Sequence, residues 1–234
     1  MVVALAFVAT AVSSLFAQSM LVRYTRDRRP QDGAWALALG MFALASVALA
    51  TGTATGWDKG TFRVFYLFGA VLDVPWLAMG TVFLLAAPAT ARRCRQVLLV
   101  FSGFAAGVLA SAPMEPVHGT AIPVGKDVFG ALPRILAAVG SGVGAVVIIV
   151  GAVSSAVRYA HDRDAPGHAR LAGANVLIAL GTLVLSSGGL VQGAVGHDEA
   201  FTATLAIGIS VIYAGFLVAA GRSETARAPR ASDG

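Results

Sequence analysis

Seven long stretches of apolar residues follow one another along the chain, and short polar segments separate them. They cover residues 2–22, 34–55, 61–86, 97–112, 132–157, 171–195 and 200–220. A helix needs about 20 mainly apolar residues to cross the hydrocarbon layer of a bilayer. Transmembrane β-strands would give alternating segments of about ten residues instead. The pattern therefore predicts an all-α polytopic membrane protein with seven transmembrane helices, of which the fourth is the shortest.

The composition supports this fold class. Of the 234 residues, 57% are hydrophobic and only 12% are charged, and the mean hydropathy is +0.77. A soluble domain carries about 25% charged residues, so a soluble enzyme, a disordered chain and a nucleic-acid-binding module are excluded. We attribute the net charge of +5 to basic loops and expect the lipid bilayer, not a nucleic acid, as the partner.

Lysine and arginine residues predict the orientation in the membrane, because loops that stay on the cytoplasmic side carry an excess of both. Thirteen follow the odd-numbered spans, and four lie on the opposite side. We therefore expect an outer N-terminus, a cytoplasmic C-terminus and a location in a bacterial plasma membrane. The thirteen are Arg23, Arg26, Arg28, Arg29, Arg92, Arg93, Arg95, Arg158, Arg163, Arg170, Arg222, Arg227 and Arg230, and the four are Lys59, Arg63, Lys126 and Arg134.

A short motif occurs twice and suggests an internal duplication. The pattern Val-Arg-Tyr-x-x-Asp-Arg occurs at residues 22–28 and again at residues 157–163. It predicts a transmembrane domain, residues 1–221, with a parallel 3+1+3 pseudo-repeat: halves 1–86 and 131–221 and a linker helix, 97–112. The alternative is that arginine and tyrosine simply favour the cytoplasmic ends of membrane helices. We expect residues 222–234 to form a disordered cytoplasmic tail.

The predicted topology resembles two families. SWEET-like sugar transporters have seven helices, an outer N-terminus and a 3+1+3 repeat, and microbial rhodopsins are also seven-helix bundles with an outer N-terminus. The chain has Pro30-Gln31 but no second Pro-Gln pair, and span 200–220 lacks the lysine that binds retinal. With 15 Arg against 2 Lys, the chain also resembles uncharacterised seven-helix membrane proteins of high-GC Gram-positive (actinobacterial) type, which implies no activity.

The third span holds the most informative polar residue. Asp73 lies near the middle of the span, where a charged side chain costs about 2.5–3.5 kcal/mol and usually marks a functional pathway. Tyr66 falls on the same helical face, and Pro75 leaves one backbone carbonyl without its helical partner. We expect Asp73 and Tyr66 to line a polar pocket. The alternative is that Asp73 is protonated and hydrogen-bonded to a neighbouring helix.

Other polar residues extend the candidate site. Arg63, Asn175 and Gln192 are further substrate-binding candidates, although an interfacial position for Arg63 and interhelical hydrogen bonds for the two amides are alternatives. The outer loop 113–130 carries Glu115, His118 and Lys126, which we expect on a lid, with a solvated connector or a metal site as alternatives. Three Gly-x-x-x-Gly patterns, starting at residues 103, 140 and 189, predict close helix packing.

We expect the protein to bind or translocate a small solute through the pocket on the third span. A receptor-like or accessory subunit that acts through a partner is the first alternative, and a membrane-embedded lipid-modifying enzyme is the second. No catalytic residue, metal site or cofactor is expected, because the chain lacks the common catalytic and phosphate-binding motifs. A small-molecule ligand, a membrane partner and a homo-oligomer remain open as partners.

Overall fold

The computed structural model describes residues 1–161, 168–195 and 197–220, without the side chains of residues 160, 168, 186, 189–195 and 220. The predicted tail, 222–234, and the last two residues of the second copy of the repeated motif, 162–163, therefore lie outside the described residues. The described part consists of helices and connecting loops, and it has no strand beyond one isolated bridge between Met114 and Phe129. Its elements are α1 (Val2–Asp27), α2 (Pro30–Thr55), α3 (Lys59–Phe65), η1 (Tyr66–Leu72), α4 (Asp73–Leu85), α5 (Pro88–Ser111), α6 (Gly125–Val128), α7 (Ala131–His161), α8 (His168–Val195) and α9 (Asp198–Ala220).

The helices have the length and composition of membrane spans. Among the described residues, six are long and apolar enough to cross a bilayer: α1, α2, the continuous unit α3–η1–α4, α5, α7 and α9. The described side chains of α8 add a shorter apolar helix, Ala169–Leu185. These helices indicate a membrane-embedded helical bundle, as the hydrophobic pattern predicts.

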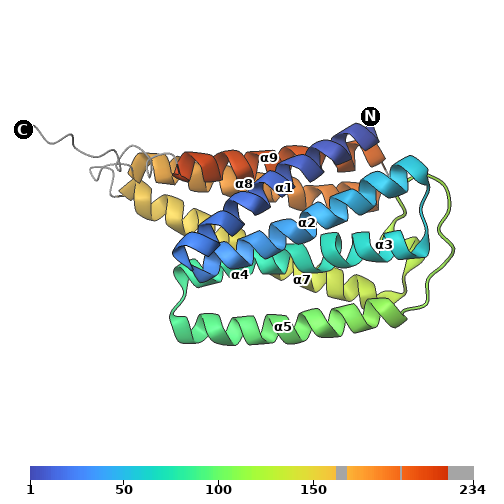
Figure 1. Ribbon diagram of the computed structural model, residues 1–234, viewed down its shortest axis with the longest axis horizontal. Coiled ribbons are helices and arrows are strands. Elements are labelled where there is room, and N and C mark those ends of the chain that lie inside the picture. The colour runs from blue at the N-terminus through green and yellow to red at the C-terminus, as the bar shows by residue number, and fades with distance from the viewer. Residues whose placement is uncertain (162–167, 196, 221–234) are drawn as a thin grey trace, which may run out of the picture.

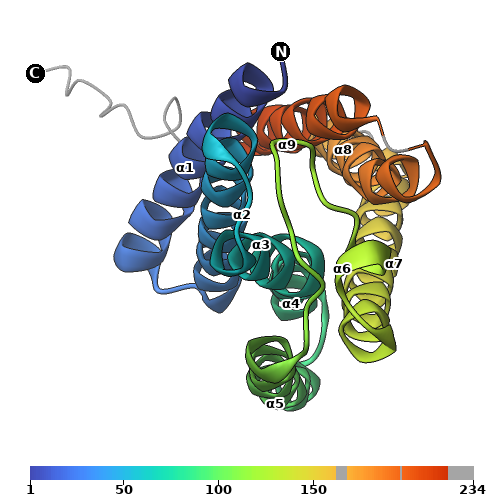
Figure 2. The same ribbon diagram turned by 90° about the vertical axis from the view of Figure 1, so that its right-hand side faces the viewer.

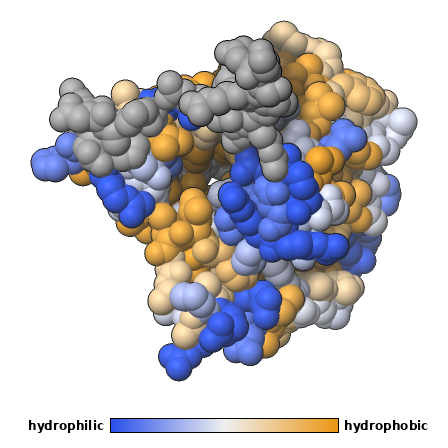
Figure 3. Space-filling model, turned by 60° about the vertical axis from the view of Figure 1, so that its left-hand side comes forward, coloured by the Kyte–Doolittle hydropathy of each residue, from blue (hydrophilic) through white to orange (hydrophobic). Residues whose placement is uncertain are grey.

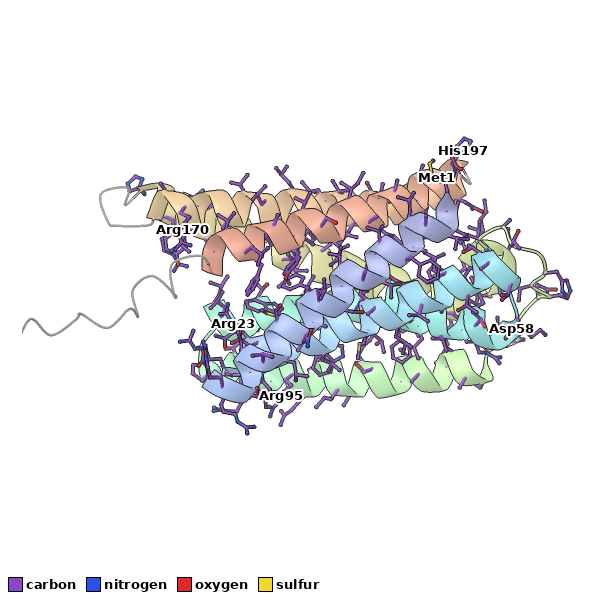
Figure 4. All side chains as sticks on the ribbon, turned by 45° about the horizontal axis from the view of Figure 1, so that its top comes forward. Met1, Arg23, Asp58, Arg95, Arg170 and His197 are labelled. Carbon is purple, nitrogen blue, oxygen red and sulfur yellow. The ribbon has the colours of Figure 1, made fainter. Side chains whose placement is uncertain are left out.

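The bundle has two chemically different ends. Figure 4 shows Arg23, Arg95 and Arg170 at one end, and Met1, Asp58 and His197 at the other. We call the first the arginine end and the second the loop end, because the 113–130 loop crosses it (Figure 2). Consecutive spans run between these ends in alternating directions (Figure 1).

Six of the helices form a closed ring. Around it, the contacts run from α1 to α2, α4, α7, α8 and α9, and α9 returns to α1. Helix α5 stands outside the ring and packs on α4 and α7 (Figure 2). The predicted linker helix is therefore the peripheral one, and the six ring helices surround the interior of the bundle.

Two helices begin earlier than the apolar pattern predicts. Pro30 and Pro88 occupy the first turns of α2 and α5, where proline is favoured because its missing N–H would have no helical partner. Polar residues expected in loops therefore belong to helices. As a result Asp32 lies in the first turn of α2 and Arg95 lies inside α5.

Two of the three Gly-x-x-x-Gly patterns can be assessed, those that start at Gly103 and Gly140, and only the second packs two helices together. A Cβ at Gly140 would lie 2.8 Å from the carbonyl oxygen of Val71, and one at Gly144 would lie 2.9 Å from the carbonyl carbon of Val74. Helix α7 thus approaches the third span at backbone distance. Nothing lies within 4 Å of a Cβ at Gly103 or Gly107, so the packing predicted for that pair is wrong, because α5 turns these glycines away from the ring.

Candidate functional site: a broken third span and a cavity at the arginine end

The third span is interrupted by a π-helix. In η1 the hydrogen bonds reach one residue further than in an α-helix, and the N–H of Asp73 donates to the carbonyl of Phe68. Pro75 has no N–H to continue this pattern toward Ala70. The hydroxyl of Ser141 in α7 donates to the Ala70 carbonyl instead, at 2.6 Å. Such π-helical turns are frequent at functional sites, and at this one Gly140 of α7 packs against the backbone of Val71.

Asp73 lies at the junction of η1 and α4. Its side chain is only 8% exposed, and Oδ1 accepts a hydrogen bond of 2.7 Å from the backbone N–H of Val74. The carboxyl group therefore satisfies a backbone donor of its own helix at the break. Leu77 and Thr81 follow at one-turn intervals on the same face, so that face continues from Asp73 toward the arginine end.

A cavity opens along that face. It has a volume of about 90 Å³ and receives side chains from each of the six ring helices. Most of the lining is apolar, and Thr81, Ser155 and Asn175 supply its polar groups. The lining residues are Phe16, Trp35, Leu77, Thr81, Leu84, Leu85, Ile148, Gly151, Ala152, Ser155, Asn175, Ile178, Ile212 and Phe216.

Asn175 reaches this cavity as an oriented amide. Its Nδ2 donates to the carbonyl of Leu171 one turn earlier in α8, at 2.8 Å. This bond leaves the amide oxygen as an acceptor. The indole N–H of Trp35, another lining residue, donates to the carbonyl of Leu77 at 3.1 Å. The first bond orients a polar group in the cavity wall, and the second ties α2 to α4 beside it.

A buried carboxyl group lies beside the cavity at the arginine end. The side chain of Asp32 is fully buried, and neither carboxylate oxygen has a hydrogen-bond partner among the described residues. Nε of Arg23 lies 3.8 Å from Oδ2 of Asp32. The guanidinium group of Arg23 also stands 4.9 Å from the ring centre of Phe216, which lines the cavity. Figure 3 shows hydrophilic patches separated by hydrophobic surface at this end.

Sequence reasoning missed the burial of Asp32, because the apolar pattern starts the second span at residue 34 and leaves Asp32 in a loop. The available signal is Pro30, which favours the first turn of a helix and would have placed Asp32 inside one. Asp32 is thus a second buried carboxyl group in the bundle, in addition to Asp73.

The loop end is closed by aromatic side chains. Tyr66 packs on Phe129 with ring centres 5.0 Å apart and on Phe62 at 5.8 Å. Phe65 extends the group to α9 by an edge contact with Phe201 at 6.3 Å. We call this the aromatic cluster. It consists of Trp57, Phe62, Phe65, Tyr66, Phe129 and Phe201.

The structure separates Tyr66 from Asp73. Tyr66 belongs to the aromatic cluster, whereas Asp73 lies two turns further along the span and bonds to its own backbone. Neither residue lines the cavity described above. On the third span, the cavity lies one to three helical turns beyond Asp73, toward the arginine end.

The 113–130 loop crosses the loop end of the bundle (Figure 2), and its Phe129 packs on Phe62 and Tyr66 of the aromatic cluster. Glu115, His118 and Lys126 point outward and are exposed. Apolar side chains make the contact with the bundle, and backbone bonds fix the loop, including one of 2.9 Å from the Trp57 N–H to the Gly119 carbonyl. The buried apolar residues are Met114, Val117, Ile122, Val128 and Phe129.

Arg63 and Gln192 complete the predicted set. A guanidinium N–H of Arg63 donates to the carbonyl of Ala112 at 2.9 Å, at the carboxyl-terminal end of α5, where a cation is favourable. Gln192 lies in a part of α8 whose side chains are outside the description. Within the described residues, no group of three or more His, Cys, Asp or Glu side chains could hold a metal ion.

No protein-family model, curated protein or solved structure matches the chain. The function must therefore be inferred from the cavity, the break and the closed end themselves.

Proposed function

We propose that this protein binds a small, mainly apolar solute in the arginine-end cavity and translocates it past the break in the third span. The observation that carries the proposal is the convergence of all six ring helices on one cavity. Ligand sites in helical membrane proteins lie between helices in this way. In the transport scheme, the structure corresponds to a state that is open at the arginine end and closed at the loop end.

The cavity restricts the chemistry of the solute. At about 10–15 Å³ per water-sized position, a volume of about 90 Å³ admits roughly six to nine non-hydrogen atoms. The wall is mostly apolar and offers only Thr81, Ser155 and Asn175 for hydrogen bonding. A compact aliphatic or aromatic molecule with one or two polar groups fits this wall. A hexose, which needs many hydrogen bonds, fits it poorly, so the SWEET-like resemblance does not extend to the substrate.

The break supplies the element that could move. A π-helical turn followed by proline leaves the third span with fewer regular hydrogen bonds than its neighbours. Two side chains bond backbone groups at this break: the Ser141 hydroxyl donates to the Ala70 carbonyl, and the Asp73 carboxylate accepts from the Val74 N–H. We assign Asp73 the role of holding the break in this state, so its carboxyl group would become available to the solute only when the break rearranges.

A receptor-like role is the second candidate. Asp73 is sealed in packing and lines neither the cavity nor the outer groove described below. This burial favours a protein that responds to a bound solute without passing it on. Both candidates share the binding site and differ only in whether the loop end opens.

The proposal includes the finer topology. It counts α8 as a membrane span, which brings the number of spans to seven. It also places the arginine end in the cytoplasm and the bundle in a bacterial plasma membrane, because arginine residues concentrate at that end. It also includes a duplication of spans one to three. Each predicted half supplies three successive helices to the ring, first α1, α2 and α4 and then α7, α8 and α9, and α5 stays outside.

Trp35 provides a direct test of binding. In a Trp57→Phe, Trp76→Phe variant, Trp35 is the remaining tryptophan, and it lines the cavity. We expect 1-hexanol and hexanoate to shift its emission in a saturable manner, whereas glucose should not. The Ala152→Phe substitution, which adds a ring to the cavity wall, should remove the shift. A shift of the Trp35 emission that does not saturate with solute concentration, or that persists in the Ala152→Phe variant, would reject the binding site.

A further inference from the structure

A second hollow lies on the outside of the ring, between α5 and the α1–α2 pair. Helix α5 packs on α4 and α7 and leaves this side open. The resulting groove has a volume of about 540 Å³ and would face the lipid. We call it the outer groove. Its lining residues are Ala17, Gln18, Leu21, Tyr24, Pro30, Gly33, Ala34, Ala36, Leu37, Gly40, Trp76, Phe83 and Arg95.

The length of the groove matches one leaflet of a bilayer. Along α2 it extends from Pro30 to Gly40, which corresponds to about 15 Å at 1.5 Å per residue. The hydrocarbon core of a bilayer is about 30 Å thick. The groove therefore starts at the arginine end and stops near the membrane centre, and an acyl chain inserted from that end would fill it.

The charges beside the groove are positive and unpaired. Arg95 lines the groove. Four exposed arginines lie at the same end, Arg28 and Arg29 between α1 and α2, and Arg92 and Arg93 near the start of α5. Among the described residues, none of these five takes part in an ion pair. The two acidic residues near this end of α1 and α2 already have arginine partners: Asp27 pairs with Arg26, and Asp32 pairs with Arg23. An anionic group is therefore favoured at the mouth of the groove.

A polar side chain in the groove also lacks a partner. Gln18 is exposed in the groove wall and makes no hydrogen bond to any described residue. An unpartnered amide facing hydrocarbon is costly.

From these observations, we propose that the outer groove is a binding site for an anionic phospholipid. One acyl chain lies along α2 past Gly40, and the phosphate group lies against Arg95 with the neighbouring arginines around it. Basic pockets between membrane helices bind anionic headgroups for this reason. The site is separate from the solute cavity, so it can be tested independently of the proposed transport.

Quenching of Trp76 by brominated lipid tests the site, because Trp76 lines the groove. The wild-type protein is reconstituted in vesicles of phosphatidylcholine, in which a fixed fraction is either dibrominated phosphatidylglycerol or dibrominated phosphatidylcholine. We expect stronger quenching by the anionic lipid, and we expect Trp76→Phe to abolish the difference. Equal quenching by both lipids would overturn the proposal, as would quenching by neither.

Matched variants separate headgroup recognition from groove filling. Arg95→Gln should remove the preference for the anionic lipid, whereas Arg158→Gln, which changes an exposed arginine in the last turn of α7 away from the groove, should keep it. Gly40 has nothing within 4 Å of a Cβ, so Gly40→Phe should occupy the groove and reduce quenching by both lipids. Gly103→Phe, an equally open position on α5, is its control. Full anionic preference in Arg95→Gln, with thermal stability unchanged, would also overturn the proposal.

Discussion

The hydroxyl of Ser141 in α7 donates a hydrogen bond of 2.6 Å to the carbonyl oxygen of Ala70 in the π-helical part of the third span. Pro75 cannot supply an N–H to this carbonyl, so the bond compensates for the break from a neighbouring helix. This single contact links the two elements that would move relative to each other if the third span rearranges.

Removal of this hydroxyl should weaken the fold. Ser141→Ala leaves the Ala70 carbonyl without its side-chain partner, and an unsatisfied buried acceptor costs about 1–3 kcal/mol. The loss should appear as a lower midpoint of thermal unfolding in detergent. Ser154→Ala in the same helix is the control, because that hydroxyl is exposed and bonds only to its own helix at Val150. Equal midpoints for both variants would argue against the role given to Ser141.

Asp73 should tolerate asparagine better than alanine. Asparagine keeps an oxygen that can accept the N–H of Val74, so Asp73→Asn should change the free energy of unfolding by less than about 1 kcal/mol. Asp73→Ala leaves that donor unpaired and should cost about 1–3 kcal/mol. Equal losses of stability for the two variants would show that the carboxylate charge, not the hydrogen bond, stabilises the break.

Gly80 allows α2 to approach α4 beside the cavity. A Cβ at Gly80 would lie 2.0 Å from Nε1 of Trp35, the atom that donates to the Leu77 carbonyl. Gly80→Ala should therefore displace the indole and lower stability by about 1–3 kcal/mol, as expected for overpacking. It should also change the emission of Trp35. Gly107→Ala, at a position with nothing within 4 Å of a Cβ, should leave both quantities unchanged.

The amino-terminal end of α3 should respond to pH through Asp58. The Thr61 hydroxyl, followed by the backbone N–H groups of Thr61 and Gly60, holds the pKa of Asp58 below its usual value of 3.8. A carboxyl group with a lowered pKa stabilises the fold above its unfolded pKa, and this contribution is lost as the pH falls through the folded pKa.

Asp58→Ala should therefore lower the unfolding midpoint at pH 7, and the difference from the wild type should shrink at about pH 3. Asp127→Ala is the control, because Asp127 is exposed in the 113–130 loop, and it should show little difference at either pH. A pH-independent effect of Asp58→Ala would contradict the assigned role of the charged carboxylate.

The sequence predicts the spans well, because a membrane requires about 20 apolar residues regardless of tertiary contacts. It predicts the ends of α2 and α5 less well, since Pro30 and Pro88 start these helices in polar sequence. For that reason the sequence does not predict the burial of Asp32, although its side chain is more deeply buried than that of Asp73.

The candidate site is predicted only in part. Hydrophobic periodicity places Asp73, Leu77 and Tyr66 on one face, but it assumes a regular α-helix. The π-helical turn between Tyr66 and Leu72 changes that register, and the aromatic cluster depends on Phe129 and Phe201 from distant parts of the chain. Contacts of this kind are set by tertiary packing and leave no local signal around Tyr66.

The central claim is that the loop end opens in a minor state. Its most direct test is cysteine labelling in a Cys94→Ser background. Solute flux into vesicles would be uninformative, because solutes of the proposed class cross a lipid bilayer unaided. Thr53→Cys places a thiol at a buried position near the loop end. Glu115→Cys gives an exposed reference at the same end, and Ala105→Cys gives a fully buried one in α5.

A membrane-impermeant thiol reagent is applied from the loop-end side. For a minor open state, populated roughly 0.1–10% of the time, Thr53→Cys should react at about that fraction of the Glu115→Cys rate, and 1-hexanol should alter the rate. If Thr53→Cys is as inert as Ala105→Cys, with and without 1-hexanol, translocation is contradicted and the receptor-like role remains.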